Sequence, residues 1–177
     1  MIFESHPWKR ELAHDADMIE RWCGKPASER QGIILERKTF ISAYTVRRLK
    51  ESNKLTDDLV ASAVPAIEYA KKQSPVTRFR HLDDIDDRYD LHVGRNCDLN
   101  LKSFVDTIIH SLYFNLAMSE DEQSVTGFYV TSDYRDKKLW FVGYSDFVKL
   151  LRSVSTNYPT HVEIWVDENG KEQRAQS

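Results

Sequence analysis

Residues 100–116 constrain the fold more than any other stretch, because their apolar side chains repeat with the cleanest helical period in the chain. The repeat has the spacing i, i+3, i+4, i+7, i+8 and i+11 that marks one face of a helix. Its members are Leu101, Phe104, Val105, Ile108, Ile109 and Leu112. Asn100 is a favoured N-cap residue directly before them. We therefore expect a helix here that lays an apolar stripe on a sheet.

Two further helices are expected at the start of the chain. Pro7 suits the first turn of one helix, and Gly24 ends it. Its apolar positions are Trp8, Leu12, Ile19, Trp22 and Cys23. Ser28 and Gln31 have the spacing of a capping box that opens a second helix. The apolar positions of this second helix are Ile33, Ile34, Phe40, Ile41, Tyr44 and Leu49. The short link between them predicts an antiparallel helical hairpin over residues 1–53.

Residues 63–93 carry strand patterns. Pro65 lies in the apolar stretch 63–70, and because proline cannot donate to a central ladder, we expect an edge strand there. Residues 77–93 are expected to form a hairpin that turns at the acidic run 83–87.

Residues 125–131 and 139–144 are almost continuously apolar, and a polar link separates them. This arrangement predicts an antiparallel hairpin deep in the sheet. Ser145 is a good N-cap residue for a short helix that follows. The residues of that helix expected to face inward are Phe147, Leu150, Leu151 and Val154.

The chain is expected to close with a strand over residues 161–166, a tight turn at Asn169 and Gly170, and a frayed tail over 171–177. The predicted fold class is therefore α+β: an N-terminal αα-hairpin followed by a mainly antiparallel sheet with two further helices packed on it. A length of 177 residues suits a single domain, with residues 54–170 forming the sheet and its helices.

Composition narrows the class of protein. No apolar run approaches the roughly 18 residues of a membrane helix, and the first residues lack a secretory signal, so we expect a cytoplasmic protein. Cys23 and Cys97 have no CxxC spacing, which argues against a zinc ribbon or a redox pair. The sequence also lacks the phosphate-binding glycine loops, the GxSxG elbow and the HExxH helix, so the enzymes that use these motifs are disfavoured.

The acidic hairpin is the first candidate site, because carboxylate and imidazole groups bind divalent ions such as Mg²⁺ or Mn²⁺. Its candidate ligands are His81, Asp83, Asp84, Asp86, Asp87, Asp90 and His92. The spacing does not fit an EF-hand loop, which needs a further ligand and a glycine in the turn. The alternative is a solvated turn in which Asp90 and His92 face Arg78 and Arg80 across the strands.

The polar side of the helix expected over residues 100–116 is the second candidate. Lys102, Asp106 and His110 are spaced four residues apart and so form one line. Asp106 and His110 are therefore candidate catalytic residues, although a catalytic pair also needs a third group and a pocket. The alternative is a ladder of polar contacts on a solvated face.

The basic second helix is the third candidate. Residues 25–54 contain eight basic and three acidic residues, whereas the whole chain has a net charge of -3. Candidate partner-binding residues are Arg30, Arg37, Arg47 and Arg48. The acidic remainder of the chain would repel nucleic acid, which favours a protein partner. The alternative is a helix face that is only solvated.

Together these patterns predict a small non-enzymatic protein that acts through a protein partner or through self-association, with no cofactor and no membrane contact. The alternative is a metal-dependent hydrolase that acts on phosphate esters or nucleic acid through the acidic hairpin. That alternative requires the hairpin ligands, and preferably His110, to converge in one concave pocket.

Overall fold

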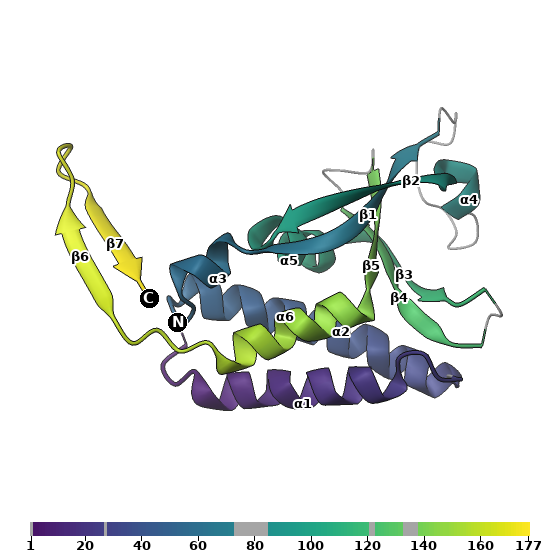
Figure 1. The fold of residues 1–177 in the computed structure, drawn as a ribbon, viewed down its shortest axis with the longest axis horizontal. Coiled ribbons are helices and arrows are strands. Elements are labelled where there is room, and N and C mark those ends of the chain that lie inside the picture. Colours follow the sequence, from purple (N-terminus) through teal and green to yellow (C-terminus); the bar gives the residue numbers. More distant parts are fainter. Residues whose placement is uncertain (1, 27, 73–84, 121–122, 133–137) are drawn as a thin grey trace.

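A computed structural model describes residues 2–26, 28–72, 85–120, 123–132 and 138–177 of the chain (Figure 1). Its helices are α1 (His6–Trp22), α2 (Glu29–Glu51), α3 (Asp57–Ala61), α4 (Ile85–Arg88), α5 (Leu101–Ile109) and α6 (Tyr144–Thr156). Its strands are β1 (Ala63–Lys71), β2 (Tyr89–Asn100), β3 (Ser111–Met118), β4 (Val125–Ser132), β5 (Lys138–Gly143), β6 (Val162–Val166) and β7 (Glu172–Gln176). The predicted α+β class is confirmed.

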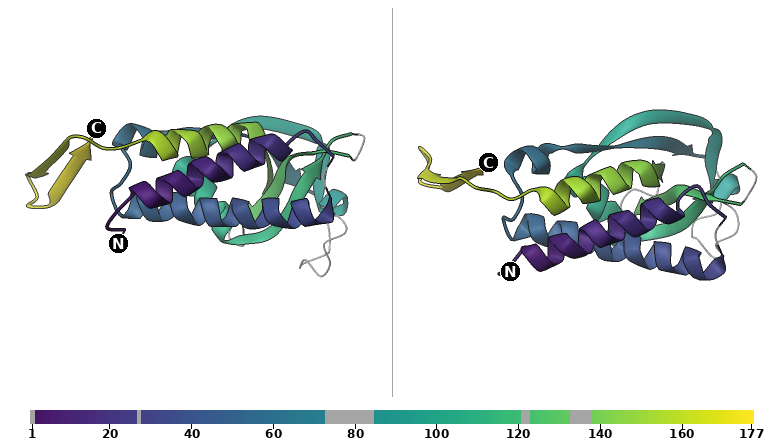
Figure 2. Two further views of the ribbon diagram at one scale, coloured as in Figure 1. Left: turned by 90° about the horizontal axis from the view of Figure 1, so that it is seen from below. Right: turned by 60° about the horizontal axis from the view of Figure 1, so that its bottom comes forward.

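Five strands form one antiparallel sheet in the order β2-β1-β5-β4-β3, and β6 and β7 form a separate two-stranded sheet. A layer of α1, α2 and α6 lies on one side of the large sheet, with α1 running beside α6 (Figure 2). The main core fills the space between this layer and the sheet. Phe128 of β4 lies within it and stacks on Phe114 of β3, with ring centroids 5.3 Å apart.

The helix predicted over residues 100–116 is shorter than its apolar period indicates. Asn100 caps it as predicted, because its Oδ1 accepts a hydrogen bond of 2.8 Å from the backbone N–H of Ser103. The helix ends at Ile109, however, and β3 starts at Ser111. Leu112 is 43% exposed, so it is not part of the helical stripe. Pairing of β3 with β4 overrides the local period here, and the aromatic pair after Leu112 suits a strand.

The predicted helical hairpin is present as α1 and α2. The capping box is confirmed, since the Ser28 side chain accepts from the N–H of Gln31 and the Gln31 side chain accepts from the N–H of Ser28. The buried face of α1 differs from the predicted one, because Trp8 is 41% exposed whereas Lys9 is fully buried. The predicted face is kept at Leu12 and Ile19, which are buried, so the difference is confined to the first turn of α1.

The first strand is not the edge strand that Pro65 predicted, because β2 pairs on one side of β1 and β5 on the other. β2 pairs with β1 from Ala63 onward, whereas β5 pairs only with residues 67–70. Pro65 therefore lies where β1 pairs with β2 alone. The strand tolerates proline there because no hydrogen bond to a second neighbouring strand is needed at this position.

The hairpin predicted over residues 77–93 cannot be compared as a whole, since residues 73–84 lie outside the described parts of the chain. Its second arm is the start of β2, which continues to Asn100 and pairs with β1. Helix α4 replaces the last part of the predicted acidic turn.

The apolar runs 125–131 and 139–144 form the predicted antiparallel hairpin as β4 and β5, inside the sheet. Ser145 is not the N-cap of the next helix. Gly143 holds that position with an extended backbone, so Ser145 already lies in the first turn of α6. The four predicted inward residues are all buried: Phe147, Leu150, Leu151 and Val154.

The C-terminal tail is not frayed, because β7 pairs along the whole of β6. The predicted turn lies between them, and Gly170 adopts a φ of 75° that suits glycine. The Oδ1 of Asp167 accepts hydrogen bonds of 2.9 Å from the N–H groups of Asn169 and Lys171, which fixes the turn. Within the described residues, no helix combines the length and the apolar character needed to cross a membrane.

Candidate interaction surface on the second helix

The second helix presents large apolar side chains outward rather than inward. Ile33, Ile41 and Tyr44, which the sequence pattern places on the covered face, are 60%, 50% and 51% exposed. The buried positions are mostly small or hydroxyl-bearing: Leu35, Thr39, Ser42, Ala43, Thr45, Val46 and Leu49. Thr39 shows how a hydroxyl is accommodated, because it donates to the carbonyl of Leu35 at 2.9 Å, one turn earlier.

The exposed apolar residues are interspersed with arginines along one line of α2. We call this line the outer stripe, and its members are Arg30, Ile33, Arg37, Ile41, Tyr44 and Arg48. At about 100° per residue, the six positions fall within roughly 80° of the helix circumference. The centre of the buried face lies on the opposite side, so the outer stripe is directed away from the core.

The outer stripe is positively charged, and Glu51, which ends the same line of α2, is already paired with Arg47 and Arg48. Among the residues that the structure describes, the guanidinium groups of Arg30 and Arg37 have neither an ion pair nor a hydrogen bond. Arg48 differs, because its Nη1 donates to Oε2 of Glu51 at 2.8 Å. Two unpaired guanidinium groups therefore flank Ile33, where they could meet carboxylates on another molecule.

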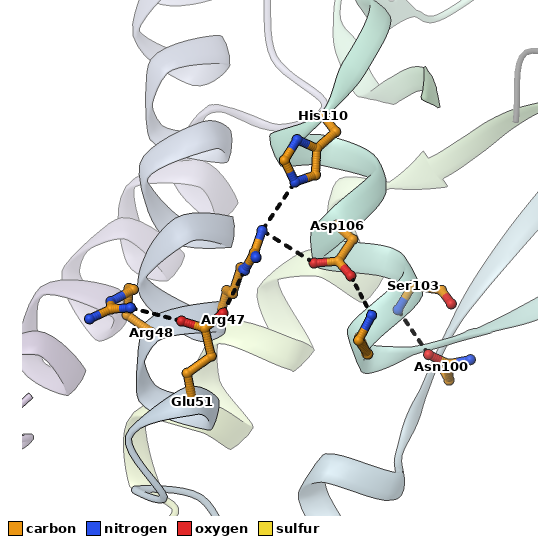
Figure 3. A network of polar contacts seen from close by, with 8 residues as sticks. Arg47, Arg48, Glu51, Asn100, Ser103, Asp106 and His110 are labelled. Carbon is orange, nitrogen blue, oxygen red and sulfur yellow. Dashed lines mark hydrogen bonds and ion pairs between the residues drawn. The ribbon is translucent and has the colours of Figure 1, made fainter. Parts of the chain in front are cut away.

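Arg47, the fourth predicted partner-binding arginine, points toward α5 instead (Figure 3). Its Nε donates to Oε1 of Glu51 at 2.8 Å, and its Nη1 lies 3.5 Å from Oδ1 of Asp106. Its Nη1 also lies 3.2 Å from Nε2 of His110. Arg47 therefore connects α2 to α5 and is not available for a partner in the way that Arg37 is.

The predicted line of Lys102, Asp106 and His110 belongs to this network. Lys102 Nζ donates to Asp106 Oδ2 at 2.9 Å. Partial burial raises the pKa of Asp106, but the hydrogen bond from Lys102 and the charges of Lys102, Arg47 and His110 outweigh burial, so the net pKa is lowered. The hydrogen bond to Glu51 raises the pKa of Arg47. Asp106 is therefore ionised and pairs with Lys102 and Arg47.

His110 and Asp106 do not form a hydrogen-bonded acid and histidine pair, because the Arg47 guanidinium lies between them (Figure 3). His110 is also the C-cap of α5. Through these contacts, Asp106 and His110 link α5 to Arg47 of α2. A catalytic role for Asp106 and His110 stays a prediction.

The acidic segment and the start of α5 lie at opposite ends of one strand. Asp86 and Asp87 lie in α4 before β2, whereas His110 ends the helix that follows β2. A strand of 12 residues spans roughly 40 Å, so α4 and α5 start from opposite ends of it (Figure 1). His92 is exposed on β2, and Asp90 accepts a 3.3 Å hydrogen bond from its N–H.

Three of the predicted metal ligands, His81, Asp83 and Asp84, lie outside the described residues. Within the described ranges, no three His, Cys, Asp or Glu side chains come together as metal ligands. The metal site on the acidic hairpin therefore stays a prediction.

A hollow of about 630 Å³ lies between the start of β1, the end of β5 and the start of α6. Cys97, Asp98 and Asp146 contribute its reactive or charged groups. Burial raises the pKa of the Cys97 thiol, which disfavours the nucleophilic thiolate. Asp146 is paired with Lys149 at 2.7 Å. Among the described residues, no hydrogen bond joins the Cys97 thiol to the side chain of a base, which is the contact that activates a nucleophile.

The chain matches no protein-family model, no curated protein and no solved structure. Its function is therefore inferred from its own residues.

Sequence reasoning identified three of the six outer-stripe residues as partner-binding candidates, Arg30, Arg37 and Arg48. It missed Ile33, Ile41 and Tyr44, because it placed these three residues on the apolar face that other elements cover. Their spacing with the arginines is the signal that could have found them.

Proposed function

We propose that this protein is a non-enzymatic interaction module whose contact surface is the outer stripe of α2. The observation that carries the proposal is the reversed distribution of side chains on this helix. Large apolar residues face solvent at Ile33, Ile41 and Tyr44, while Thr39 and Ser42 are fully buried. Single exposed apolar residues are common, but three on one helical line, interspersed with arginines, are typical of a protein-binding surface.

The expected partner is a protein segment that combines acidic with apolar side chains. Its apolar residues would cover Ile33, Ile41 and Tyr44, and its carboxylates would pair with Arg30 and Arg37. Burying on the order of 100 Å² on each of three side chains is worth roughly 7 kcal/mol, before the cost of association is subtracted. The arginine contacts therefore have to supply part of the affinity and most of the specificity.

Nucleic acid is a less suitable partner for the outer stripe. The chain has a net charge of -3, so a duplex that approached the stripe would also meet an acidic body. Phosphate binding also gains nothing from the exposed isoleucines, whereas a protein partner would cover them. Charge and apolar exposure together favour a protein.

Replacing Arg37 with glutamate is expected to abolish partner binding. The change reverses a charge in the middle of the outer stripe, and truncating or reversing an interfacial charge pair costs about 2–5 kcal/mol of binding free energy. Tagged wild-type protein and Arg37→Glu would be used to capture partners from lysate, followed by titration of the captured protein. We expect at least about a 30-fold loss of affinity.

Arg10→Glu is the matched control, because Arg10 is exposed on α1 and the substitution changes the net charge by the same amount. Arg10→Glu should retain the partner and Arg37→Glu should lose it. Equal retention by both variants would contradict the proposal. Salt-sensitive binding of wild-type protein to duplex DNA that Arg37→Glu abolishes would contradict the protein partner.

A further inference from the structure

The β6–β7 hairpin stands apart from the helices and the large sheet, with β6 on its outer side (Figures 1 and 2). β7 holds it to the body: the N–H of Gln176 donates to Oδ2 of Asp57 at 2.8 Å, and the Gln176 side chain donates to the carbonyl of Leu55. Among the described strands, β6 pairs only with β7. One edge of β6 is therefore open.

The backbone hydrogen bonds show which groups face this open edge. His161 and Ser177 exchange both bonds, at 3.0 and 3.1 Å, and the N–H of Asp167 donates to Lys171 at 2.9 Å. Since the pattern alternates along an antiparallel strand, the odd-numbered residues of β6 bond to β7. The N–H and C=O groups of Val162, Ile164 and Val166 point outward, where no described strand receives them.

The same three residues form an exposed apolar row. Val162, Ile164 and Val166 are 44%, 61% and 65% exposed, and they share one face of β6 because side chains alternate along a strand. Natural proteins protect free edges with charged residues, proline or bulges, and this row has none of them. A two-stranded hairpin alone is also only marginally stable in water. β6 therefore has the properties of a strand that gains another strand.

We propose that β6 pairs with β6 of a second copy of this chain, antiparallel about a two-fold axis at Ile164. This pairing makes a four-stranded sheet in which Ile164 faces Ile164 of the other copy and Val162 faces Val166. Each β6 strand has three outward N–H groups and three outward C=O groups. In the pair, each of these groups forms a hydrogen bond with the other strand. The two apolar rows become one continuous apolar strip.

A second copy suits this edge better than an unrelated strand, because the row is self-complementary. A two-fold axis at Ile164 places residues at equal distances before and after Ile164 opposite each other. Val162 and Val166 are at equal distances and are both valine, so the row is complementary to a second copy of itself. The flanks match as well, since His161 of one copy would face Asp167 of the other. The surface is distinct from the outer stripe of α2, so the dimer and the proposed partner contact stand or fall separately.

The contact is small, so the dimer is expected to dissociate on dilution. Pairing two strands of five residues buries less than the roughly 1,200 Å² that separates stable from transient interfaces. We expect the average mass to rise from 20.7 kDa toward twice that value between micromolar and millimolar concentration.

Sedimentation equilibrium over this concentration range tests the proposal with two variants of Ile164. Ile164→Lys places like charges opposite each other at the axis. Ile164→Pro removes only an N–H that points to the open edge, so the ladder with β7 is kept. Both variants should remain at the monomer mass at every concentration. Ile33→Lys is the matched control, because Ile33 is exposed to the same extent on α2 and should leave the dimer unchanged.

A wild-type chain that stays monomeric up to about 1 mM would overturn the proposal, as would Ile164 variants that dimerise like the wild type. Loss of the dimer in Ile33→Lys with retention in Ile164→Lys would place self-association on α2 and would also overturn it. Near-ultraviolet circular dichroism that matches the wild type would establish that each variant is folded.

Discussion

Replacing Phe128 with alanine is expected to lower the free energy of unfolding by about 3–5 kcal/mol. Phe128 is fully buried, and its ring lies 5.3 Å from Phe114, 5.4 Å from Tyr144 and 5.7 Å from Phe147, centroid to centroid. It therefore joins β3 and β4 to α6, and the cavity left by its ring would remove contacts on both sides of the core. Urea denaturation measures the loss as a lower midpoint.

Leu112→Ala is the informative control for this experiment. A continuous helix over residues 100–116 would bury Leu112 in the core and make its truncation cost about 2–5 kcal/mol. In β3 the side chain is 43% exposed, so we expect a loss below about 1 kcal/mol. Equally large losses for Phe128→Ala and Leu112→Ala would contradict the end of α5 at Ile109.

Lys9 is expected to contribute an increase of roughly 2 kcal/mol to the free energy of unfolding as the pH rises from 8 to 10. Burial, and then the charge of Lys54, lowers the pKa of Lys9 from 10.5 to about 8. Its ammonium group donates to the carbonyls of Lys54 and Asn157 and lies 4.0 Å from the centroid of the Tyr158 ring. These contacts only partly replace the water that a charged lysine loses on burial.

The sign follows from the protons bound in each state. Between pH 8 and 10 the unfolded chain keeps the Lys9 proton whereas the folded chain loses it, so stability increases as pH rises. Burial raises the pKa of Cys23, Cys97, Tyr69 and Tyr129, so these groups have the opposite effect on stability in the same pH range. The contribution of Lys9 is therefore taken as the difference between the wild type and a variant without Lys9.

Denaturation of wild type, Lys9→Met and Arg10→Met at pH 8, 9 and 10 measures this effect. Lys9→Met should lose the increase. Arg10→Met should keep it, because Arg10 is exposed beside Lys9 in the sequence. An increase of the same size in Lys9→Met would show that another group causes it.

The parts of the fold that the sequence predicts correctly are those governed by local signals. Ser28 and Asn100 begin helices because their side chains accept hydrogen bonds from the first turn, which depends on no distant residue. The apolar runs that form β4 and β5 pair because a polar link joins them directly. The inward residues of α6 follow a helical period that no competing strand interrupts.

The incorrect predictions fall where pairing with an element distant in the sequence determines the local structure. Leu112 lies in a strand because the residues on either side of it, Ser111 and Tyr113, pair with β4. β1 becomes an inner strand because β5 arrives later in the chain. The tail becomes β7 through its pairing with β6. On α2 the buried face contains hydroxyl groups, of which Thr39 bonds to the carbonyl of Leu35 and Ser42 bonds to Asp15 of α1, so this face does not look apolar in the sequence. The sequence signal of the outer stripe is therefore the spacing of its apolar residues with the arginines.

The proposed function depends most on whether the outer stripe meets a partner in the cell. A photoreactive phenylalanine analogue placed at Tyr44 tests this directly. Tyr158 is the matched position, because it is 43% exposed against 51% for Tyr44 and belongs to another part of the surface. After irradiation of living cells, the proposal predicts a discrete cross-linked protein with the analogue at residue 44 and not at residue 158. No cross-link at residue 44, or the same product at both positions, would contradict it.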